Sequence, residues 1–274
     1  MRDAALQSLA VGFFDGVHLG HQAILRGTSA ALTFRNHPLT ILAPEKAPRL
    51  IMSVEERVAA IKACGVKDVM VLDFTRELAE MSAEEFVRRY VQGEKVSCGE
   101  NWRFGVGGTG DAAFLRSRGI DVAVAPYIEY KGERVSSSRI RRCLENGEIE
   151  DANAMMGRQF KVQGFKFKGK GLGTDMGYPT VNLKLNPIML KLPLGVYEVD
   201  VAGVKAIANY GQAPTLGEQS WEAPIMEVHF LQSPPQLAAE TSVSLVRFIR
   251  PERKFDSLQD LQYQIAADCA KIKS

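Results

Sequence analysis

The chain has 274 residues, of which 46% are hydrophobic and 24% charged, and its formal net charge at pH 7 is +2. This composition is ordinary for a folded globular protein and gives no reason to expect a nucleic-acid or membrane partner. No apolar stretch approaches the roughly 18 residues of a membrane span, and the start lacks the pattern of a signal peptide. Scattered cysteines without a Cys-x-x-Cys spacing predict reduced thiols rather than disulfides or a zinc site. We therefore expect a cytoplasmic protein with one large or two modest domains.

Short apolar runs alternate with helical patterns over the first half of the chain. The stretch SVEERVAAIKACG, for example, opens with Ser53 and carries Glu56 three residues later, which predicts a helix with a capping box. The apolar runs are continuous, as in parallel strands that are buried on both faces. We predict strands at 9–14, 30–34, 66–74, 95–100 and 120–130, and helices at 21–27, 53–65 and 82–93. Their alternation indicates a doubly wound parallel sheet.

The second half of the chain has a different rhythm. Residues 135–158 predict two short helices separated by an Asn-Gly pair, and a β pattern follows. An Ala-Gly pair at 202–203 predicts a tight hairpin, and Ser257 with Asp260 predicts the start of a last helix, 257–272. The predicted strands are 161–169, 178–185, 195–201, 204–211, 224–231 and 241–249. Six short strands and a terminal helix indicate a small antiparallel β-barrel.

Residues 12–22, GFFDGVHLGHQ, carry the strongest chemical signal of the first half. They lead from a predicted strand into a helix, at the edge of the sheet where open α/β folds bind ligands. Because helix N-termini attract phosphate and histidines three residues apart share nearly one face, His18 and His21 could stabilise a transferred phosphate. A zinc site would need further ligands, and only His37 and His229 remain, without a helpful spacing. Two merely structural histidines are a further alternative. We favour the phosphate site.

The same stretch resembles the H-x-G-H signature of the nucleotidyltransferase superfamily, in the form found in bacterial bifunctional riboflavin kinase/FAD synthetases. Further blocks similar to that family follow in order over almost the whole chain. They are TFRNHP (33–38), CGENWRFGVGGTGD (98–111), VSSSRIRRCLENGEIEDANAMMGR (135–158), GKGLGTDMGYPTVN (169–182), GVYEVDV, NYGQAPT, MEVHFL and IRPERKFDSLQDLQYQI. The resemblance implies a nucleotidyltransferase-like FMN adenylyltransferase domain over 1–157 and a flavokinase-like riboflavin kinase barrel over 158–274.

The resemblance also implies site residues in the first domain, which would transfer AMP from ATP to FMN. The two histidines would contact the ATP phosphates, and the segment SSSRIR would form a second phosphate grip. By resemblance, the catalytic residues are His18 and His21, the ATP-binding residues are Gly12, Phe13, Asp15, Gly16, Ser136, Ser137, Ser138, Arg139 and Arg141, and the flavin-binding residues are His37, Asn101, Trp102 and Arg103. The residues alone leave simpler alternatives open. The segment SSSRIR can be a helix cap with solvated arginines, Trp102 can be buried in an ordinary loop, and His37 can be a packed loop histidine.

In the second domain, GKGLGTDMGYPTVN supplies glycines whose backbone amides can approach phosphate, although no G-K-[ST] closes a Walker A loop. The resemblance implies that Glu227 is the general base for the ribityl 5′-hydroxyl and that Thr180 and Asn182 hold Mg²⁺. The implied ATP-binding residues are Gly169, Gly171, Gly173, Gly177, Pro179 and Thr180. The residues alone leave two alternatives open. The glycine-rich segment can be a simple β-turn, and Glu227 can face solvent on the same strand face as His229.

These features predict an enzyme that makes FMN and then FAD, with ATP, Mg²⁺ and flavins as its small-molecule partners. Only LRGTSAA separates the H-x-G-H loop from the TFRNHP strand, which is shorter than in family members and short for a crossover helix. Either the first helix is truncated or a segment is missing from the sequence as given. The functional alternatives are a riboflavin kinase with an impaired adenylyltransferase domain and a non-catalytic flavin-binding regulator.

Overall fold

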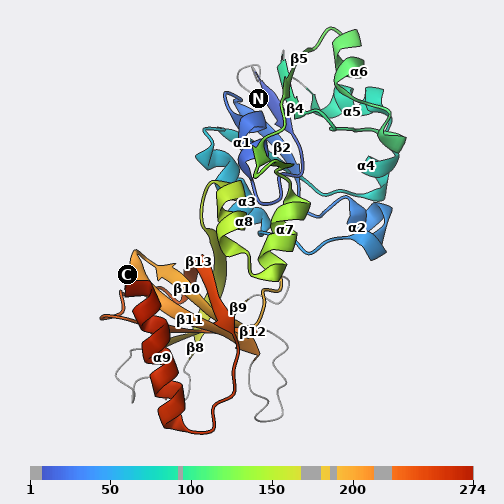
Figure 1. Cartoon of the computed structure of the whole chain (residues 1–274). Helices are drawn as coiled ribbons and strands as arrows, with labels where there is room; N and C mark the ends of the chain where they lie inside the picture. The colour runs from blue at the N-terminus through green and yellow to red at the C-terminus, as the bar shows by residue number, and fades with distance from the viewer. Residues whose placement is uncertain (1–7, 92–94, 168–179, 186–189, 213–223, 274) are drawn as a thin grey trace. The chain divides into compact units, whose positions relative to one another are not determined.

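A computed structural model of the chain (Figure 1) describes residues 8–91, 95–167, 180–185, 190–212 and 224–273. The chain divides into two compact units, Met1–Arg139 and Ile140–Ser274. Within the described ranges, no helix is both long enough and apolar enough to cross a membrane.

The first unit is built on a parallel sheet with the strand order β3-β2-β1-β4-β5. Its strands are β1 (Leu9–Val11), β2 (Ala30–Phe34), β3 (Asp68–Leu72), β4 (Lys95–Gly99) and β5 (Asp121–Ala125). The chain builds β1, β2 and β3 outward in one direction and then returns to place β4 on the other side of β1. The strand order therefore reverses between β1 and β4, which confirms the doubly wound sheet.

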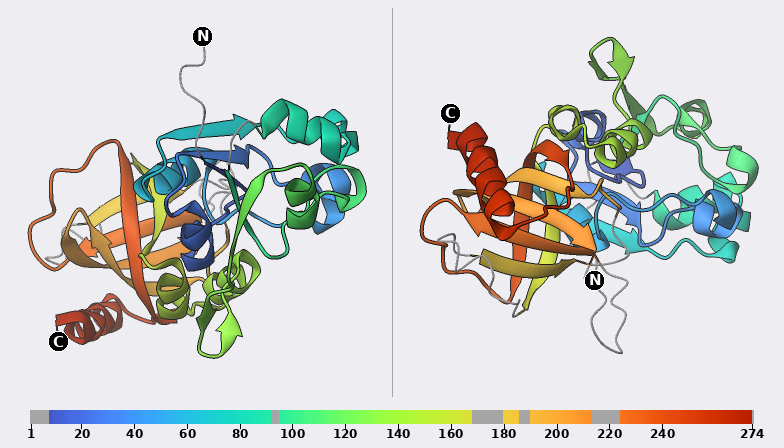
Figure 2. Two further views of the ribbon diagram at one scale, coloured as in Figure 1. Left: turned by 90° about the horizontal axis from the view of Figure 1, so that it is seen from above. Right: turned by 60° about the horizontal axis from the view of Figure 1, so that its bottom comes forward.

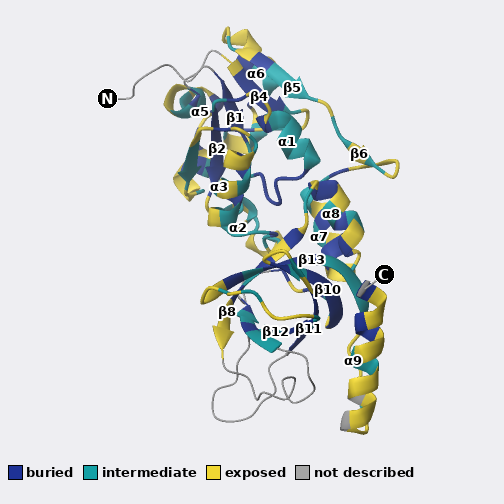
Figure 3. Ribbon diagram, turned by 90° about the vertical axis from the view of Figure 1, so that its left-hand side faces the viewer, coloured by how far each residue is buried: buried dark blue, intermediate teal, exposed yellow. Residues whose placement is uncertain are grey.

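Helices cover both faces of this sheet, because alternate residues of each strand point to opposite faces. Ala10 and Ala31 pack with Leu25 and Ile61 on one face, whereas Leu32 packs in the cluster on the other face. Figure 3 shows β1, β2 and β4 as the buried centre of the unit. The helices are α1 (Leu19–Leu25), α2 (Leu39–Leu42), α3 (Val54–Ala63), α4 (Arg76–Glu80), α5 (Ala83–Tyr90) and α6 (Ala112–Ser117), with 3₁₀ turns η1 (Pro44–Lys46) and η2 (Val106–Gly108).

The predicted capping box at the start of α3 is confirmed. The Ser53 hydroxyl accepts from the Glu56 N–H at 3.1 Å, and the Ser53 N–H donates to the Glu56 carboxylate at 2.8 Å. The short helix α4 was not predicted, because five residues are too few to display a helical period. Its first turn is nevertheless capped by the Thr75 hydroxyl, which accepts from the Leu78 N–H at 3.2 Å.

The first crossover is short but complete. Helix α1 has seven residues, and Gly27, with φ of 74°, turns the chain into β2. The two strands that α1 connects still pair in parallel, with Leu9 opposite Ala30 and Val11 opposite Leu32. A truncated first helix is therefore compatible with an intact parallel sheet.

The second unit contains the predicted closed β-barrel, with the strand order β10-β11-β12-β9-β8-β13 and antiparallel pairings. Its strands are β8 (Phe160–Phe167), β9 (Thr180–Leu185), β10 (Gly195–Val201), β11 (Val204–Gln212), β12 (Pro224–Phe230) and β13 (Glu240–Pro251). Ala202 and Gly203 form the predicted two-residue hairpin, both with positive φ as a type I′ turn requires. A small hairpin, β6 (Glu129–Tyr130) and β7 (Glu133–Arg134), belongs to the first unit.

Three further helices are α7 (Ser137–Asn146), α8 (Ile149–Met156) and α9 (Leu258–Lys273). Helix α8 packs on the barrel, where the Asn153 amide donates to the Leu245 carbonyl at 2.9 Å. Helix α9 runs along the outside of the barrel (Figures 1 and 2) and is anchored by the buried Asp268, which accepts from Arg250 at 2.8 Å. The unit boundary falls inside α7, and the limits 1–157 and 158–274 stay a prediction about the functional domains.

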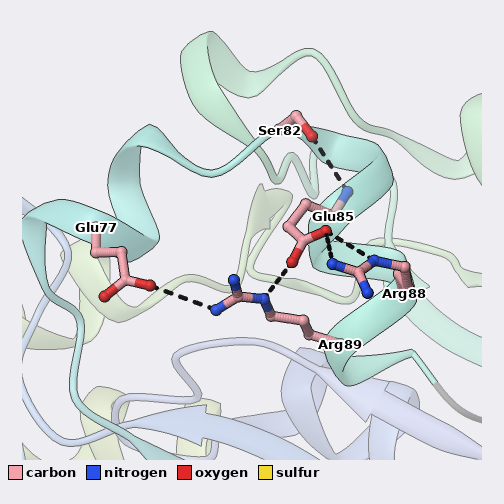
Figure 4. A network of polar contacts seen from close by, with 5 residues as sticks. All are labelled: Glu77, Ser82, Glu85, Arg88 and Arg89. Carbon is pink, nitrogen blue, oxygen red and sulfur yellow. Dashed lines mark hydrogen bonds and ion pairs between the residues drawn. The ribbon is translucent and has the colours of Figure 1, made fainter.

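A polar network on the surface of the first unit joins α4 to α5 (Figure 4). Glu85 binds both Arg88 and Arg89, and Arg89 also lies 3.4 Å from Glu77. Hydrogen bonds from the two arginines lower the pKa of the Glu85 carboxyl. Because both arginines and Glu77 are exposed, the network contributes little to stability.

Candidate functional site

The turn after β1, residues 12–18, is fixed by hydrogen bonds to its own carbonyl groups. The Thr33 hydroxyl donates to the Phe13 carbonyl at 2.9 Å, and the Ser137 hydroxyl donates to the Asp15 carbonyl at 2.9 Å. The Gln22 amide donates to the Val17 carbonyl at 3.0 Å. Groups from β2, α7 and α1 therefore hold this turn in one shape.

The backbone of the same turn is strained. Phe14 and Val17 have φ of 57° and 38°, a region that such side chains rarely adopt. Gly16 has φ of 79°, and a Cβ there would lie 3.1 Å from the Ile51 side chain. Strain of this kind persists only where the surroundings impose it, and it concentrates at functional sites.

A cavity of about 370 Å³ opens beside this turn, at the carboxyl ends of β1, β4 and β5. The strand order reverses between β1 and β4, and open α/β sheets bind their ligands at such a switch point. The volume lies within the range of small-molecule sites. Of the residues that the sequence predicts to bind nucleotide or flavin, the cavity is lined by Gly12, Phe13, His18, His21, Asn101, Trp102, Ser136, Ser137 and Ser138.

The two histidines form a stacked pair in the cavity wall. His18 is the N-cap of α1, and its Nδ1 accepts from the His21 N–H at 3.3 Å. This bond assigns the proton of a neutral His18 to Nε2. The two rings stack with centroids 3.7 Å apart, and Phe14 packs edge-on against His21. The fold therefore fixes both imidazoles at the edge of the cavity.

The N-terminus of α7 reaches the same cavity. The Ser136 hydroxyl accepts from the Arg139 N–H at 3.2 Å, so Ser136 caps the first turn as the sequence indicates. The neighbouring Ser137 hydroxyl is bound to the turn after β1. Backbone N–H groups at the start of a helix favour an anion, which makes this wall of the cavity suited to phosphate.

A second group of polar residues lies on the outer face of the barrel. Glu227 on β12 is directly opposite Asn182 on β9 and Asn209 on β11. The adjacent Met226 and Val228 are buried inside the barrel, so Glu227 projects outward and its side chain is 33% exposed. Thr180 is the partner of His229 in the same pairing and lies two residues before Asn182, on the same face.

The protein-family model described as FAD synthetase matches residues 2–139 of the chain, and the family model described as riboflavin kinase matches residues 156–274. A bifunctional riboflavin kinase/FMN adenylyltransferase from Bacillus subtilis is 31% identical and covers 97% of this chain and 91% of its own length. The chain belongs to this bifunctional family. Relatives with the same name from Escherichia coli K12 and Pseudomonas fluorescens are 30% and 32% identical, covering 95% and 96% of this chain and 90% and 91% of their own lengths.

The fold of the family is shared with a solved structure over the whole chain. A crystal structure described as a macrolide-efflux protein from Streptococcus pneumoniae has a TM-score of 0.85 and 27% identity, and the match covers 97% of this chain and 94% of that one. Together with the two family models, this likeness confirms both the resemblance read from the sequence and the predicted fold class.

Several residues expected in the adenylyltransferase site lie outside its cavity. The Asp15 carboxylate accepts from the Ile51 N–H at 3.1 and 3.2 Å, and so holds the turn from behind. Arg139 donates to the carbonyls of Tyr130 and Glu133 and thereby holds the β6–β7 hairpin. His37 accepts from the Leu39 N–H at 3.1 Å at the start of α2. The other expected residues that do not line the cavity are Gly16, Arg103 and Arg141.

Among the lining residues that were not predicted as site residues, two form a polar pair. Tyr127 and Arg134 form a cation–π pair, with the guanidinium carbon 3.6 Å from the ring centroid. Their sequence signal is weak, because Tyr127 and β6 fall inside the strand predicted at 120–130, and Arg134 ends the two-residue strand β7, which was not predicted. In the kinase half, Gly169, Gly171, Gly173, Gly177 and Pro179 lie outside the described residues.

His229 is a buried titratable group on the same outer face as Glu227. Its Nε2 lies 3.8 Å from the Glu227 carboxylate, too far for a hydrogen bond, and its Nδ1 has no hydrogen-bond partner in the described structure. Burial lowers the pKa of His229, and the charge of Glu227 only partly opposes this shift. The native imidazole is therefore neutral at pH values where an exposed histidine becomes charged.

We expect His229→Gln to weaken the pH dependence of stability in the acid range. The unfolded histidine titrates near its ordinary pKa of about 6.5, and the native one titrates lower. Below pH ~6.5 the unfolded chain binds a proton that the native chain does not, so this contribution to stability is full at higher pH and is lost as the pH falls. Urea midpoints at pH 7.5, 6.5 and 5.5 should drop more steeply for the wild type than for the variant. Equal slopes would contradict the prediction.

Proposed function

We propose that this chain phosphorylates riboflavin to FMN on the barrel unit and adenylylates FMN to FAD in the cavity of the parallel sheet, both with ATP. The observation that carries the proposal is the gathering of the two expected residue sets at two separate places in one chain. His18, His21 and the serines of α7 line one cavity, and Glu227, Thr180 and Asn182 share one face of the barrel. We also propose that the enzyme acts in the cytoplasm and that it binds small molecules but no nucleic acid.

In the adenylyl transfer, an oxygen of the FMN phosphate attacks the α-phosphorus of ATP in line, and the bond to the β-phosphate breaks as pyrophosphate leaves. The nucleophile is already ionised, so the protein supplies positioning and charge stabilisation rather than a base. His18 presents Nε2–H to the phosphates, with its Nδ1 engaged in capping α1. The N-terminus of α7 binds the phosphates from the other wall.

The flavin is proposed to bind at the end of β4, on the same cavity. Trp102 lines the cavity and stacks on Phe104, with ring centroids 4.6 Å apart and 24° between the planes. Phe104 packs in turn against Phe86 and Phe114, so the indole is supported by a cluster of aromatic rings. Such a platform suits the flat isoalloxazine ring, and the Asn101 amide beside it can hydrogen-bond the ring edge.

In the kinase half, Glu227 is proposed to accept the proton of the ribityl 5′-hydroxyl. The hydroxyl oxygen then attacks the γ-phosphorus of ATP, the bond to the β-phosphate breaks, and ADP leaves. Glu227 lies on β12 between Asn182 on β9 and Asn209 on β11, so the paired strands of the barrel hold its carboxylate in place. The rigid placement supplies the orientation that such a transfer needs.

Mg²⁺ fits the donor set of this face. Thr180 and Asn182 offer a hydroxyl and an amide oxygen, and Mg²⁺ takes a few protein oxygens together with water and phosphate. No group of three or more His, Cys, Asp or Glu residues in the described ranges could hold a metal ion by itself. When bound, the ion would neutralise charge on the ATP phosphates, while Thr180 and Asn182 would hold it.

A chromatographic time course of riboflavin, ATP and Mg²⁺ with the purified chain tests the proposal. We expect FMN to rise first and FAD to follow, because the product of one site is the substrate of the other. FMN that accumulates without FAD would leave only the kinase, which the shortened α1 first suggested. Bound flavin without any product would favour the non-catalytic regulator instead.

A further inference from the structure

A fully buried arginine lies behind the adenylyltransferase cavity. Arg57 of α3 has 0% of its surface exposed, and burial lowers its pKa although the charges of Asp15 and Glu55 oppose the shift. Its Nη2 donates to the carbonyls of Phe34, at 2.5 Å, and of Arg35, at 3.3 Å. Its Nε and Nη1 have no hydrogen-bond partner in the described structure.

This arrangement is a poor way to stabilise a fold. Buried donors without partners carry a desolvation cost, and well-packed apolar residues often replace buried charges without loss of stability. The presence of a guanidinium here therefore calls for an explanation in terms of what it holds in place.

The guanidinium contacts two segments, one of which lines the cavity. Its carbon lies 4.2 Å from the centroid of the Phe13 ring, and Phe13 lines the cavity. The carbonyls that it binds belong to the end of β2, the segment that leads to His37. The His37 ring packs edge-on against Phe13, with centroids 4.8 Å apart. Arg57, Phe13 and His37 thus form one continuous row of side-chain contacts.

We propose that Arg57 is a positioning residue for adenylyl transfer. It fixes Phe13 in the cavity wall relative to the segment from Phe34 to His37. It touches no substrate. The planar guanidinium is needed for both contacts, because it can lie flat on a ring and donate in its own plane to carbonyl oxygens. The inference rests on the proposed adenylyltransferase activity of this cavity.

The test measures activity and stability of Arg57→Met in the full chain. Methionine fills a similar volume without a charge, so we expect the melting temperature to stay the same or to rise. We expect kcat for FAD formation to fall about 10- to 100-fold, with the KM values for ATP and FMN within roughly threefold, because displaced walls cost more in the transition state than in substrate binding. Riboflavin phosphorylation by the same preparation should keep its rate.

Two comparisons make the result decisive. Ile61→Val, a buried change on α3 in a core cluster that does not include Phe13, should lower the melting temperature without lowering kcat for FAD formation at low temperature. The double variant of Arg57→Met with Phe13→Leu should lose no more activity than Phe13→Leu alone, because both changes break the same contact. Arg57→Lys keeps the charge without the plane and should recover only part of the loss.

An unchanged kcat in Arg57→Met would overturn the proposal, and so would a loss of activity that follows a loss of melting temperature. Multiplicative losses in the double variant would also count against it. If the wild-type chain forms no FAD from FMN and ATP, the proposed function of the cavity fails, which is a separate outcome because the wild type is measured first.

Discussion

Glu227→Gln is expected to lower riboflavin phosphorylation about 10²- to 10⁴-fold, the usual contribution of a positioned general base. Glutamine keeps the size and the hydrogen-bonding capacity of the side chain but cannot take the proton of the 5′-hydroxyl. The substitution lies on the outer face of the barrel between Asn182 and Asn209, where a neutral amide is easily accommodated. The fall should therefore appear in kcat and leave the folded structure intact.

FAD formation from added FMN is the internal control for this variant, since it takes place in the other compact unit. Glu240→Gln provides a matched control in the same barrel, because Glu240 is an exposed carboxylate at the start of β13. It should leave both activities unchanged. Retention of full kinase activity in Glu227→Gln would mean that Glu227 merely faces solvent.

His18→Asn is expected to lower FAD formation about 10²- to 10³-fold, the usual effect of losing one donor to a developing charge. The two nitrogens of His18 have different roles. Nδ1 caps α1 by accepting from the His21 N–H, and an asparagine oxygen can replace this contact because asparagine is a good N-cap. Nε2 is proposed to contact phosphate, and asparagine cannot reach as far. The variant therefore separates structure from chemistry at one residue.

His18→Ala serves as the comparison, because it removes the cap together with the phosphate contact. We expect thermal unfolding of His18→Asn to match the wild type and that of His18→Ala to begin at lower temperature, with kinase activity retained in both. If His18→Asn forms FAD at the wild-type rate, His18 has a structural role only, as the sequence alone left open.

The sequence predicts most of the fold because local signals and the long-range pattern agree. Ser53 and Glu56 start α3, and continuous apolar runs place the parallel strands. The predicted first strand nevertheless extended through Phe14, whereas β1 ends at Val11. Apolarity cannot show this end, because the turn is itself buried and its reversal depends on positive φ angles at Phe14 and Val17.

The candidate sites are predictable to different depths. The H-x-G-H loop and the serines of α7 are found from their motifs, since their chemistry is local. Arg57 reads in the sequence as an ordinary polar position of a capped helix. Its burial arises from Phe13 and the end of β2, which are distant in the chain, so no local pattern reveals it. Arg139 differs, because the carbonyls that it binds in the β6–β7 hairpin are only six and nine residues away in the chain.

The strand order also determines when each strand of the sheet gains its neighbours during translation. β1 lies in the middle of the sheet, yet it is made first, and its partner β4 leaves the ribosome only after β2 and β3. Until then one edge of β1 is unpaired, and the nascent chain is open to aggregation over that interval. Every residue that lines the adenylyltransferase cavity lies between Val11 and Ser138. All these residues are therefore synthesised before the first barrel strand, β8, so the residues of the site that acts second on the flavin are the first to be made.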